Sequence, residues 1–228
     1  MVISILSIFP EICESIERSP VIACLVASGS LVLEWIDIKD FAGGSFRHID
    51  DSPYGGGAGM ILRCQPVLDA LEFAKVRHPE LDHHSVLLAP IGHVYQQKDA
   101  RRLAACEHLI LICGHYEGFD ARVYDYVDEL ISIGDYILTG GELPAMVLLD
   151  SITRLTKGAL REESTREESF ENGLLEYPQY TRPAVFDGKA VPEVLLSGNH
   201  EAIRRWRREE SEKLTRRLRP DLVYPLEQ

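Results

Sequence analysis

Residues 131–144 have the sequence Ile-Ser-Ile-Gly-Asp-Tyr-Ile-Leu-Thr-Gly-Gly-Glu-Leu-Pro. The run is apolar and strand-like, is interrupted by Gly134 and closes with Gly140-Gly141, and a helical period follows from 143 to 155. Glycines let a ligand approach the main chain, whose N–H and C=O groups can bond a planar heterocycle or a carboxylate. The pattern therefore predicts either a structural turn between a buried strand and a helix or a ligand-binding loop.

Elsewhere in the chain, short apolar runs alternate with helical periods. Strands are predicted at 2–8, 31–38, 85–89 and 108–113, and helices at 10–18, 21–27, 65–77 and 96–106. This alternation indicates an α/β fold with a mostly parallel sheet. Because ligands of such sheets bind beyond the carboxyl ends of the strands, we expect one pocket to be lined by segments 89–92, 114–118 and 133–141.

Composition places the protein in the ordinary soluble globular class. The 228 residues are 45% hydrophobic and 26% charged, and no apolar run reaches the ~18 residues that span a bilayer. The apolar start, residues 2–9, lacks a basic flank, so we expect no signal peptide. Five scattered cysteines without C-x-x-C spacing predict reduced thiols in a cytoplasmic protein and argue against structural zinc.

Charge is distributed unevenly along the chain. The formal net charge is −12, yet residues 204–219 contain eight basic and three acidic side chains. We predict a helix at 200–218, capped by Asn199, that carries this basic segment. It is either an element that docks on phosphate or a solvated helix that pairs with the acidic remainder of the chain.

A glycine-rich segment, residues 50–59 with the sequence Asp-Asp-Ser-Pro-Tyr-Gly-Gly-Gly-Ala-Gly, ends a stretch without periodicity that begins at residue 40. No Lys-Ser/Thr follows it and no strand precedes it, which excludes a phosphate-binding loop and a dinucleotide fingerprint. Long irregular segments in compact domains are usually functional or mobile. We therefore expect a flexible loop that faces the substrate.

Five stretches together carry a family resemblance. They are residues 50–60, 113–118 (Cys-Gly-His-Tyr-Glu-Gly), 132–144, 174–183 (Leu-Leu-Glu-Tyr-Pro-Gln-Tyr-Thr-Arg-Pro) and 195–200 (Leu-Leu-Ser-Gly-Asn-His). In this order the sequence resembles the bacterial tRNA (guanine-N1)-methyltransferase family, TrmD, of the SPOUT superfamily. The similarity extends from residues 8–11 to residues 217–220 and so covers nearly the whole chain.

The resemblance implies a SPOUT fold with a deep C-terminal trefoil knot and a small helical C-terminal domain. It implies a methyltransferase domain at 1–160, a flexible linker with the catalytic base at 161–173 and a tRNA-binding domain at 174–228. It also implies a cytoplasmic homodimer with active sites at the subunit interface, which acts on tRNA and on no membrane. The implied reaction takes a methyl group from S-adenosyl-L-methionine to N1 of the guanosine 3′ of the anticodon, position 37. Magnesium dependence is associated with the family, but no metal-ligating residue is assigned here.

Two residues match the catalytic positions of the family. Guanine N1 carries a proton that a base must remove, and a fixed cation stabilises the charge that develops on the neighbouring oxygen. The resemblance places the base at Glu168, where the family has aspartate, and the cation at Arg154. The longer glutamate can displace the proton acceptor by about an ångström, which can be costly. The structural alternatives are an acidic linker for Glu168 and a charge that complements the helix dipole for Arg154.

The resemblance also assigns binding residues. Those for the methyl donor are Leu88, Pro90, Gly114, Glu117, Ile133, Gly134, Asp135, Tyr136, Ile137, Leu138, Gly140, Gly141 and Pro144. Those for the target nucleotide are Asp50, Tyr54 and Gly59. Those for tRNA phosphates are Arg182, Asn199, His200, Arg204, Arg205, Arg208 and the rest of the basic helix.

Three other functions compete with this one. A SPOUT methyltransferase that modifies another RNA position would share the donor pocket but not the segments at 53–59 and 177–183. A catalytically inactive RNA-binding relative would keep both binding sites, and this alternative stays open because of the departure at Glu168. A nucleotide-binding oxidoreductase is disfavoured because the G-x-G-x-x-G fingerprint is absent.

Overall fold

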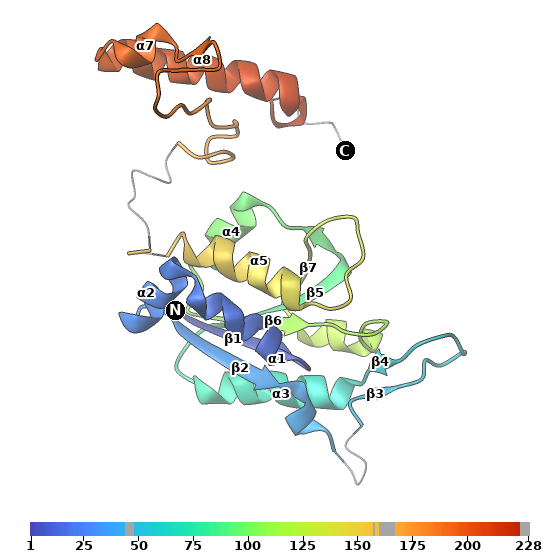
Figure 1. Ribbon diagram of the computed structural model, residues 1–228. Helices are drawn as coiled ribbons and strands as arrows, with labels where there is room; N and C mark the ends of the chain where they lie inside the picture. Colours follow the sequence, from blue (N-terminus) through green and yellow to red (C-terminus); the bar gives the residue numbers. More distant parts are fainter. Residues whose placement is uncertain (44–47, 157, 160–166, 224–228) are drawn as a thin grey trace. The chain divides into compact units, whose positions relative to one another are not determined.

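The chain divides into two compact units, Met1–Leu160 and Arg161–Gln228. The computed structural model describes residues 1–43, 48–156, 158–159 and 167–223 (Figure 1). The first unit contains the large sheet and both clusters of buried apolar side chains. The second unit contains the long basic helix.

A five-stranded sheet forms the centre of the first unit, with every strand pair parallel. Its order is β2 (Val32–Asp37), β1 (Val2–Ser7), β6 (His108–Cys113), β5 (His83–Val94) and β7 (Glu129–Ser132). The two central strands β1 and β6 are buried throughout and rich in β-branched and leucine residues, as parallel strands covered on both faces usually are. The predicted α/β class and parallel sheet are confirmed.

Helices cover both faces of the sheet (Figure 1). Along β6, Leu109 and Leu111 pack into one core, whereas Ile110 and Ile112 pack into the other, because successive strand side chains point to opposite faces. The first core is covered by α1 (Pro10–Glu14), α2 (Pro20–Ala27), α4 (Gln97–Leu103) and α5 (Glu142–Thr153). The second is covered by α3 (Cys64–Arg77) with the 3-10 turns η2 (Ile38–Phe41) and η3 (Ala121–Tyr126).

Several elements depart from the sequence-based expectation. The helix predicted at 10–18 is α1 followed by a 3-10 turn, η1 (Ser15–Arg18). The strand-like run that begins at Ile131 ends at Ser132, because Gly134 has a φ of 147° that an extended strand does not adopt. The segment at 40–59, expected to lack structure, includes β3 (Asp50–Asp51), which pairs antiparallel with β4 (Ile61–Leu62).

Strand β5 is longer than predicted because pairing resumes beyond its proline. The register to β7 shifts between Leu88 and His93, both of which lie opposite Ile131. The intervening residues 89–92 include Pro90, which has no N–H to donate to a ladder. They therefore form a bulge at the carboxyl end of the strand.

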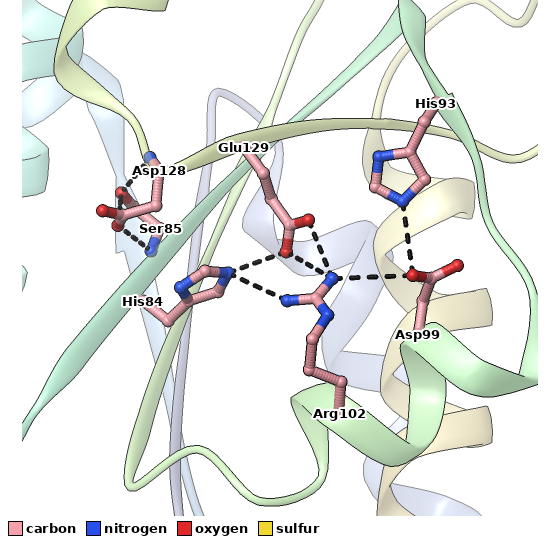
Figure 2. Close-up of polar contacts among 7 residues, drawn as sticks. All are labelled: His84, Ser85, His93, Asp99, Arg102, Asp128 and Glu129. Carbon is pink, nitrogen blue, oxygen red and sulfur yellow. Dashed lines mark hydrogen bonds and ion pairs between the residues drawn. The ribbon is translucent and has the colours of Figure 1, made fainter.

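A polar cluster around Arg102 of α4 holds both ends of β5 (Figure 2). The guanidinium donates from Nη2 to Glu129 Oε2 of β7 at 2.8 Å and lies 3.6 Å from Asp99 Oδ1. His84, near the start of β5, is 2.7 Å from Glu129 Oε1, and His93, near its end, is 3.4 Å from Asp99 Oδ1. The residues between these histidines are thus fixed to the helix and to the neighbouring strand.

His108 is a buried histidine at the start of β6. Its Nε2 is hydrogen-bonded to Ser4 Oγ at 2.8 Å and its Nδ1 to His83 Nδ1 at 2.9 Å, while the His78 ring lies 5.0 Å away between centroids. Burial, followed by the positive charges of His83 and His78, lowers the pKa of His108 to about 4. Glu34 and Glu80 oppose this shift.

The free energy of unfolding should consequently fall on acidification. Between pH 6.5 and 4 the unfolded chain binds a proton at His108 that the folded protein does not, so stability present above pH 6.5 is lost as the pH falls through this window. We expect a loss on the order of 2 kcal/mol. Urea unfolding at pH 7 and pH 4.5 measures it. His108→Gln should reduce the difference, whereas the exposed control His93→Gln should not, and an unchanged difference in His108→Gln would contradict the assignment.

The second unit is built on α8 (His200–Leu218). Asn199 Oδ1 accepts a hydrogen bond from Ala202 N at 3.1 Å, which confirms the predicted helix cap. Leu175 is fastened to the helix because its N donates to Thr215 Oγ1 at 2.9 Å and its carbonyl accepts from Ser211 Oγ at 2.6 Å. The smaller elements are β8 (Val185–Phe186), β9 (Lys189–Ala190), α7 (Glu193–Leu196) and the 3-10 turn η4 (Pro220–Leu222).

Candidate functional site

A cavity of about 340 Å³ lies at the carboxyl ends of β5, β6 and β7. Its wall comes from residues 88–91, 114–119, 131–134, 136–141 and 144, together with Tyr124. The three segments expected to share a pocket therefore do so. All candidate donor-binding residues line this cavity except Asp135, which is not among its lining residues.

Glycines bring two of these segments into contact. Gly141 N donates to Gly114 O at 2.8 Å, and Gly140 forms a β-bridge with His115. A Cβ on Gly141 would lie 2.7 Å from both Cys113 Cα and Gly114 N. Only glycine allows this approach, so the sequence Gly140-Gly141 is a packing requirement of the cavity wall.

A compact turn shapes the opposite wall. Tyr136 N donates to Gly134 O at 2.9 Å, and the Tyr136 hydroxyl donates to Ile133 O at 3.2 Å. Ser132 Oγ donates to Gly134 O at 3.1 Å. These hydrogen bonds hold the turn, and the apolar residues Ile137 and Leu138 that follow it line the cavity. The wall thus combines apolar surface with nearby main-chain polar groups, as sites for planar ligands commonly do.

The glycine-rich loop is joined to the cavity wall by backbone contacts. Glu117 N donates to Met60 O at 3.0 Å, and a Cβ on Gly59 would overlap the Glu117 side chain. Burial, followed by the charge and hydrogen bonding of Asp50, raises the pKa of Tyr116. Asp50 and Gly59, two candidates for the target nucleotide, thus adjoin residues that line the cavity.

A second cavity, of about 730 Å³, adjoins the first at Phe119, which lines both. The third target-nucleotide candidate, Tyr54, is fully exposed and lines this cavity. Asp120 and Arg122 line the same cavity, and hydrogen bonds from Arg122 hold the pKa of the Asp120 carboxyl well below its usual range. This cavity was not predicted from the sequence. Nothing in the pattern of residues 119–126 indicates that Asp120 and Arg122 form an ion pair at its wall.

The two candidate catalytic residues belong to different units. Arg154 terminates α5 and is half-buried, and it is not among the residues that line the first cavity. Glu168 is half-buried in the second unit, where its carbonyl accepts from Glu171 N at 3.3 Å. The linker expected at 161–173 lies partly outside the described residues, which resume at Glu167.

Helix α8 carries both paired and unpaired cations. Toward its C-terminus, Arg208 and Arg216 each lie 3.3 Å from Glu212, and Lys213 lies 2.7 Å from Glu210. At its start, Arg204 and Arg205 are exposed. Within the described part of the chain, neither has an ion-pair partner.

The other candidates for tRNA binding lie on the same unit. Arg182 is exposed in the extended segment before β8. Asn199 uses its side chain to cap α8, and His200 is the exposed first residue of that helix. Exposed cations of this unit thus lie at the start of the helix and in the segment before β8, and Lys189 of β9 and Arg217 near the end of α8 are exposed as well.

The described residues contain no cluster of three His, Cys, Asp or Glu side chains that could hold a metal ion. In the same described ranges, no helix has the length and apolar character required to cross a membrane.

Comparison with known proteins gives matches along nearly the whole chain. A sequence model of the family described as tRNA (Guanine-1)-methyltransferase TrmD matches residues 1–225. A protein of Listeria innocua serovar 6a is 47% identical, over 99% of this chain and 94% of its own. A protein of Caldanaerobacter subterraneus subsp. tengcongensis is 48% identical, over 98% of this chain and 92% of its own. A protein of Clostridium botulinum is 47% identical, over 97% of this chain and 91% of its own. All three are named tRNA (guanine-N(1)-)-methyltransferase.

Proposed function

The chain belongs to the tRNA (guanine-1)-methyltransferase family, and from this premise we propose that it methylates N1 of a guanosine in tRNA. The observation that carries the proposal is the similarity to named methyltransferases over the full length, 47% with the Listeria innocua protein. The protein is thus an enzyme of the transferase class. The target is the guanosine 3′ of the anticodon, position 37, and the protein works in the cytoplasm.

The first cavity is the site for S-adenosyl-L-methionine. When bound, this donor supplies an electrophilic methyl group on a sulfonium. Leu88, Leu138 and Pro144 offer apolar surface to the adenine, and the main chain around Gly140 offers hydrogen-bonding groups to its edge. Glu117, whose side chain lines the cavity, attracts the positive charge of the donor. The residues present therefore fit the ligand in shape and in charge.

Proton removal and charge stabilisation fall to two side chains. The carboxylate of Glu168 accepts the proton of guanine N1, which frees the nitrogen lone pair for attack on the methyl group. The guanidinium of Arg154 stabilises the negative charge that develops on the guanine oxygen. Glu167 is the poorer candidate for the base, because its Oε2 already accepts from the Tyr177 hydroxyl at 2.8 Å and from Arg207 at 3.4 Å.

We propose that the backbone of the first unit, the SPOUT domain at 1–160, forms the deep trefoil knot of this superfamily. Support comes from two close crossings of separate segments. A Cβ on Gly92 would overlap the backbone at Ile131, and one on Gly141 would lie 2.7 Å from the backbone at Cys113. Residues 161–173 serve as the linker that carries Glu168, and residues 174–228 as the helical tRNA-binding domain.

A homodimer with active sites at the subunit interface accounts for an exposed apolar face beside the cavity. A shallow groove there is lined mostly by apolar residues from the 133–138 turn and α5. Tyr136, Leu143 and Val147 are 54%, 51% and 47% exposed, which is high for large apolar side chains of one surface region. Contiguous apolar surface of this kind is typical of protein interfaces.

Methyl transfer from labelled S-adenosyl-L-methionine to unmodified tRNA transcripts tests the function. We expect incorporation into a transcript with guanosine 3′ of the anticodon and none into the matched transcript with adenosine there. Incorporation into both would favour a methyltransferase of another specificity. Donor and tRNA binding without incorporation would favour an inactive RNA-binding relative.

Arg204 and Arg205 should carry more of the tRNA affinity than the paired cations of the same helix. An unpaired arginine can neutralise a phosphate and release its counterion, with a salt slope of about 0.7 to 0.9 for each contact. The double variant Arg204→Ala/Arg205→Ala should weaken tRNA binding about tenfold at low salt and reduce the slope of log K against log salt by about 1 to 2.

The matched control is Lys213→Ala/Arg216→Ala, which removes the same charge from side chains engaged by Glu210 and Glu212. Filter binding at several salt concentrations provides both affinity and slope. Equal losses in the two double variants would show that net charge, and not the unpaired arginines, governs binding.

A further inference from the structure

Glu142, the first residue of α5, has a buried carboxyl group with no part in the mechanism above. The residue is only 3% exposed, and its Oε1 accepts a hydrogen bond from Ser7 Oγ of β1 at 2.6 Å. Burying an ionisable group is costly unless it is hydrogen-bonded or interacts with other charges. Its position next to the first cavity suggests what compensates for that cost.

Only one layer of residues separates this carboxyl group from the cavity. His115 and Gly140 line the cavity, and a Cβ on Gly140 would overlap Glu142 Oε2. His115 Nδ1 is buried, has no hydrogen-bond partner among the described residues, and lies 4.0 Å from the same oxygen. The Glu142 carboxyl group therefore lies directly behind the wall formed by Gly140 and the imidazole.

The start of α5 offers a partial positive charge to a carboxylate at this position. Glu142 begins a twelve-residue helix, whose N-terminus stabilises anions. In the described residues, the groups that face Glu142 are Ser7, Cys13, Cys113 and His115, none of which is a permanent cation.

We propose that Glu142 makes the cavity selective for the charge of its ligand, so that the sulfonium donor binds more tightly than the neutral thioether left after transfer. This inference rests on the proposed function. In the reaction the sulfur–carbon bond breaks, the sulfur keeps the electron pair and becomes neutral, and the methyl group forms a bond to guanine N1. The displaced N1 proton goes to Glu168. The attraction to Glu142 therefore vanishes with the charge, which favours release of the product.

Calorimetric dissociation constants for S-adenosyl-L-methionine and S-adenosyl-L-homocysteine test the proposal, because the two ligands differ in the methyl group and its charge. In Glu142→Gln we expect the preference for the charged ligand to fall five- to tenfold, with the affinity for the neutral ligand changed less than twofold. The control Glu72→Gln, an exposed acid on α3, should leave both constants unchanged. Equal weakening of both ligands in Glu142→Gln would overturn the proposal, since a merely structural role predicts it.

If Glu142→Gln does not fold, a second variant still tests the role of Glu142. Glu117→Gln removes the carboxylate that lines the cavity and leaves Glu142 behind the wall. Because Glu117 also attracts the donor, this variant should lose part of the preference for the charged ligand but keep at least a fivefold preference, and complete loss of the preference would overturn the role of Glu142. If the wild-type protein binds both ligands equally, the proposed role of Glu142 is wrong but the proposed methyl donor is not contradicted. If the wild-type protein binds neither ligand, the proposed methyl donor is wrong.

Discussion

Replacing Glu168 by glutamine is expected to lower the rate of methyl transfer to a guanosine-containing tRNA transcript about a hundredfold or more. The amide keeps the shape of the side chain but cannot accept the proton of guanine N1 at neutral pH. Because Glu168 is assigned to proton removal and not to the donor cavity, the dissociation constant for S-adenosyl-L-methionine should stay within about twofold. Single-turnover methyl transfer and calorimetry measure the two quantities separately.

Two neighbouring variants serve as controls for Glu168. Glu167→Gln should retain most of the activity, because that side chain is held by Tyr177 and Arg207. Glu168→Asp introduces the aspartate that the family resemblance implies at this position and should also remain active. Full activity in Glu168→Gln would move the base to another residue.

Gly141→Ala is expected to destabilise the first unit and to weaken donor binding at least tenfold. The added methyl group would lie 2.7 Å from Cys113 Cα and Gly114 N, and backbone atoms of a buried strand end cannot withdraw as a flexible side chain can. Overpacking of this kind costs about 1 to 3 kcal/mol. Thermal unfolding reports the stability and calorimetry the affinity.

The control for this variant is Gly43→Ala, where no atom of the described residues lies within 4 Å of the added carbon. It should leave the melting temperature and the donor affinity unchanged. Wild-type donor affinity in Gly141→Ala would mean that the contact between the two segments does not shape the cavity.

The parts of the fold that follow from local pattern were predictable. The run Leu-Ile-Leu-Ile in β6 marks a strand buried on both faces, and Asn199 marks a helix start because its side chain can cap. The convergence of segments 89–92, 114–118 and 133–141 followed from the parallel sheet alone. Roles for single residues came from the family resemblance, since periodicity does not distinguish a ligand-binding leucine from a core leucine.

Other features depend on contacts between distant segments. Pro90 indicated the end of β5, but the strand resumes after a bulge because Tyr95 N and the preceding residues find partners on β7. Glu142 has the sequence signature of an acidic residue at a helix N-terminus, which is normally exposed. Only the approach of Ser7 and His115, more than 25 positions away in sequence, shows that it is buried.

The hydrogen bond from Glu117 N to Met60 O has a consequence for the order of events in a catalytic cycle. It links the loop assigned to the target nucleotide with the wall assigned to the donor, so a rearrangement of one segment alone would break this hydrogen bond. A ligand that orders one of these two segments lowers the entropy cost of ordering the other segment. By reciprocity, the factor by which donor raises tRNA affinity equals the factor by which tRNA raises donor affinity. We therefore expect cooperative binding of the two substrates, with amide hydrogen exchange slowed in both loops by either ligand.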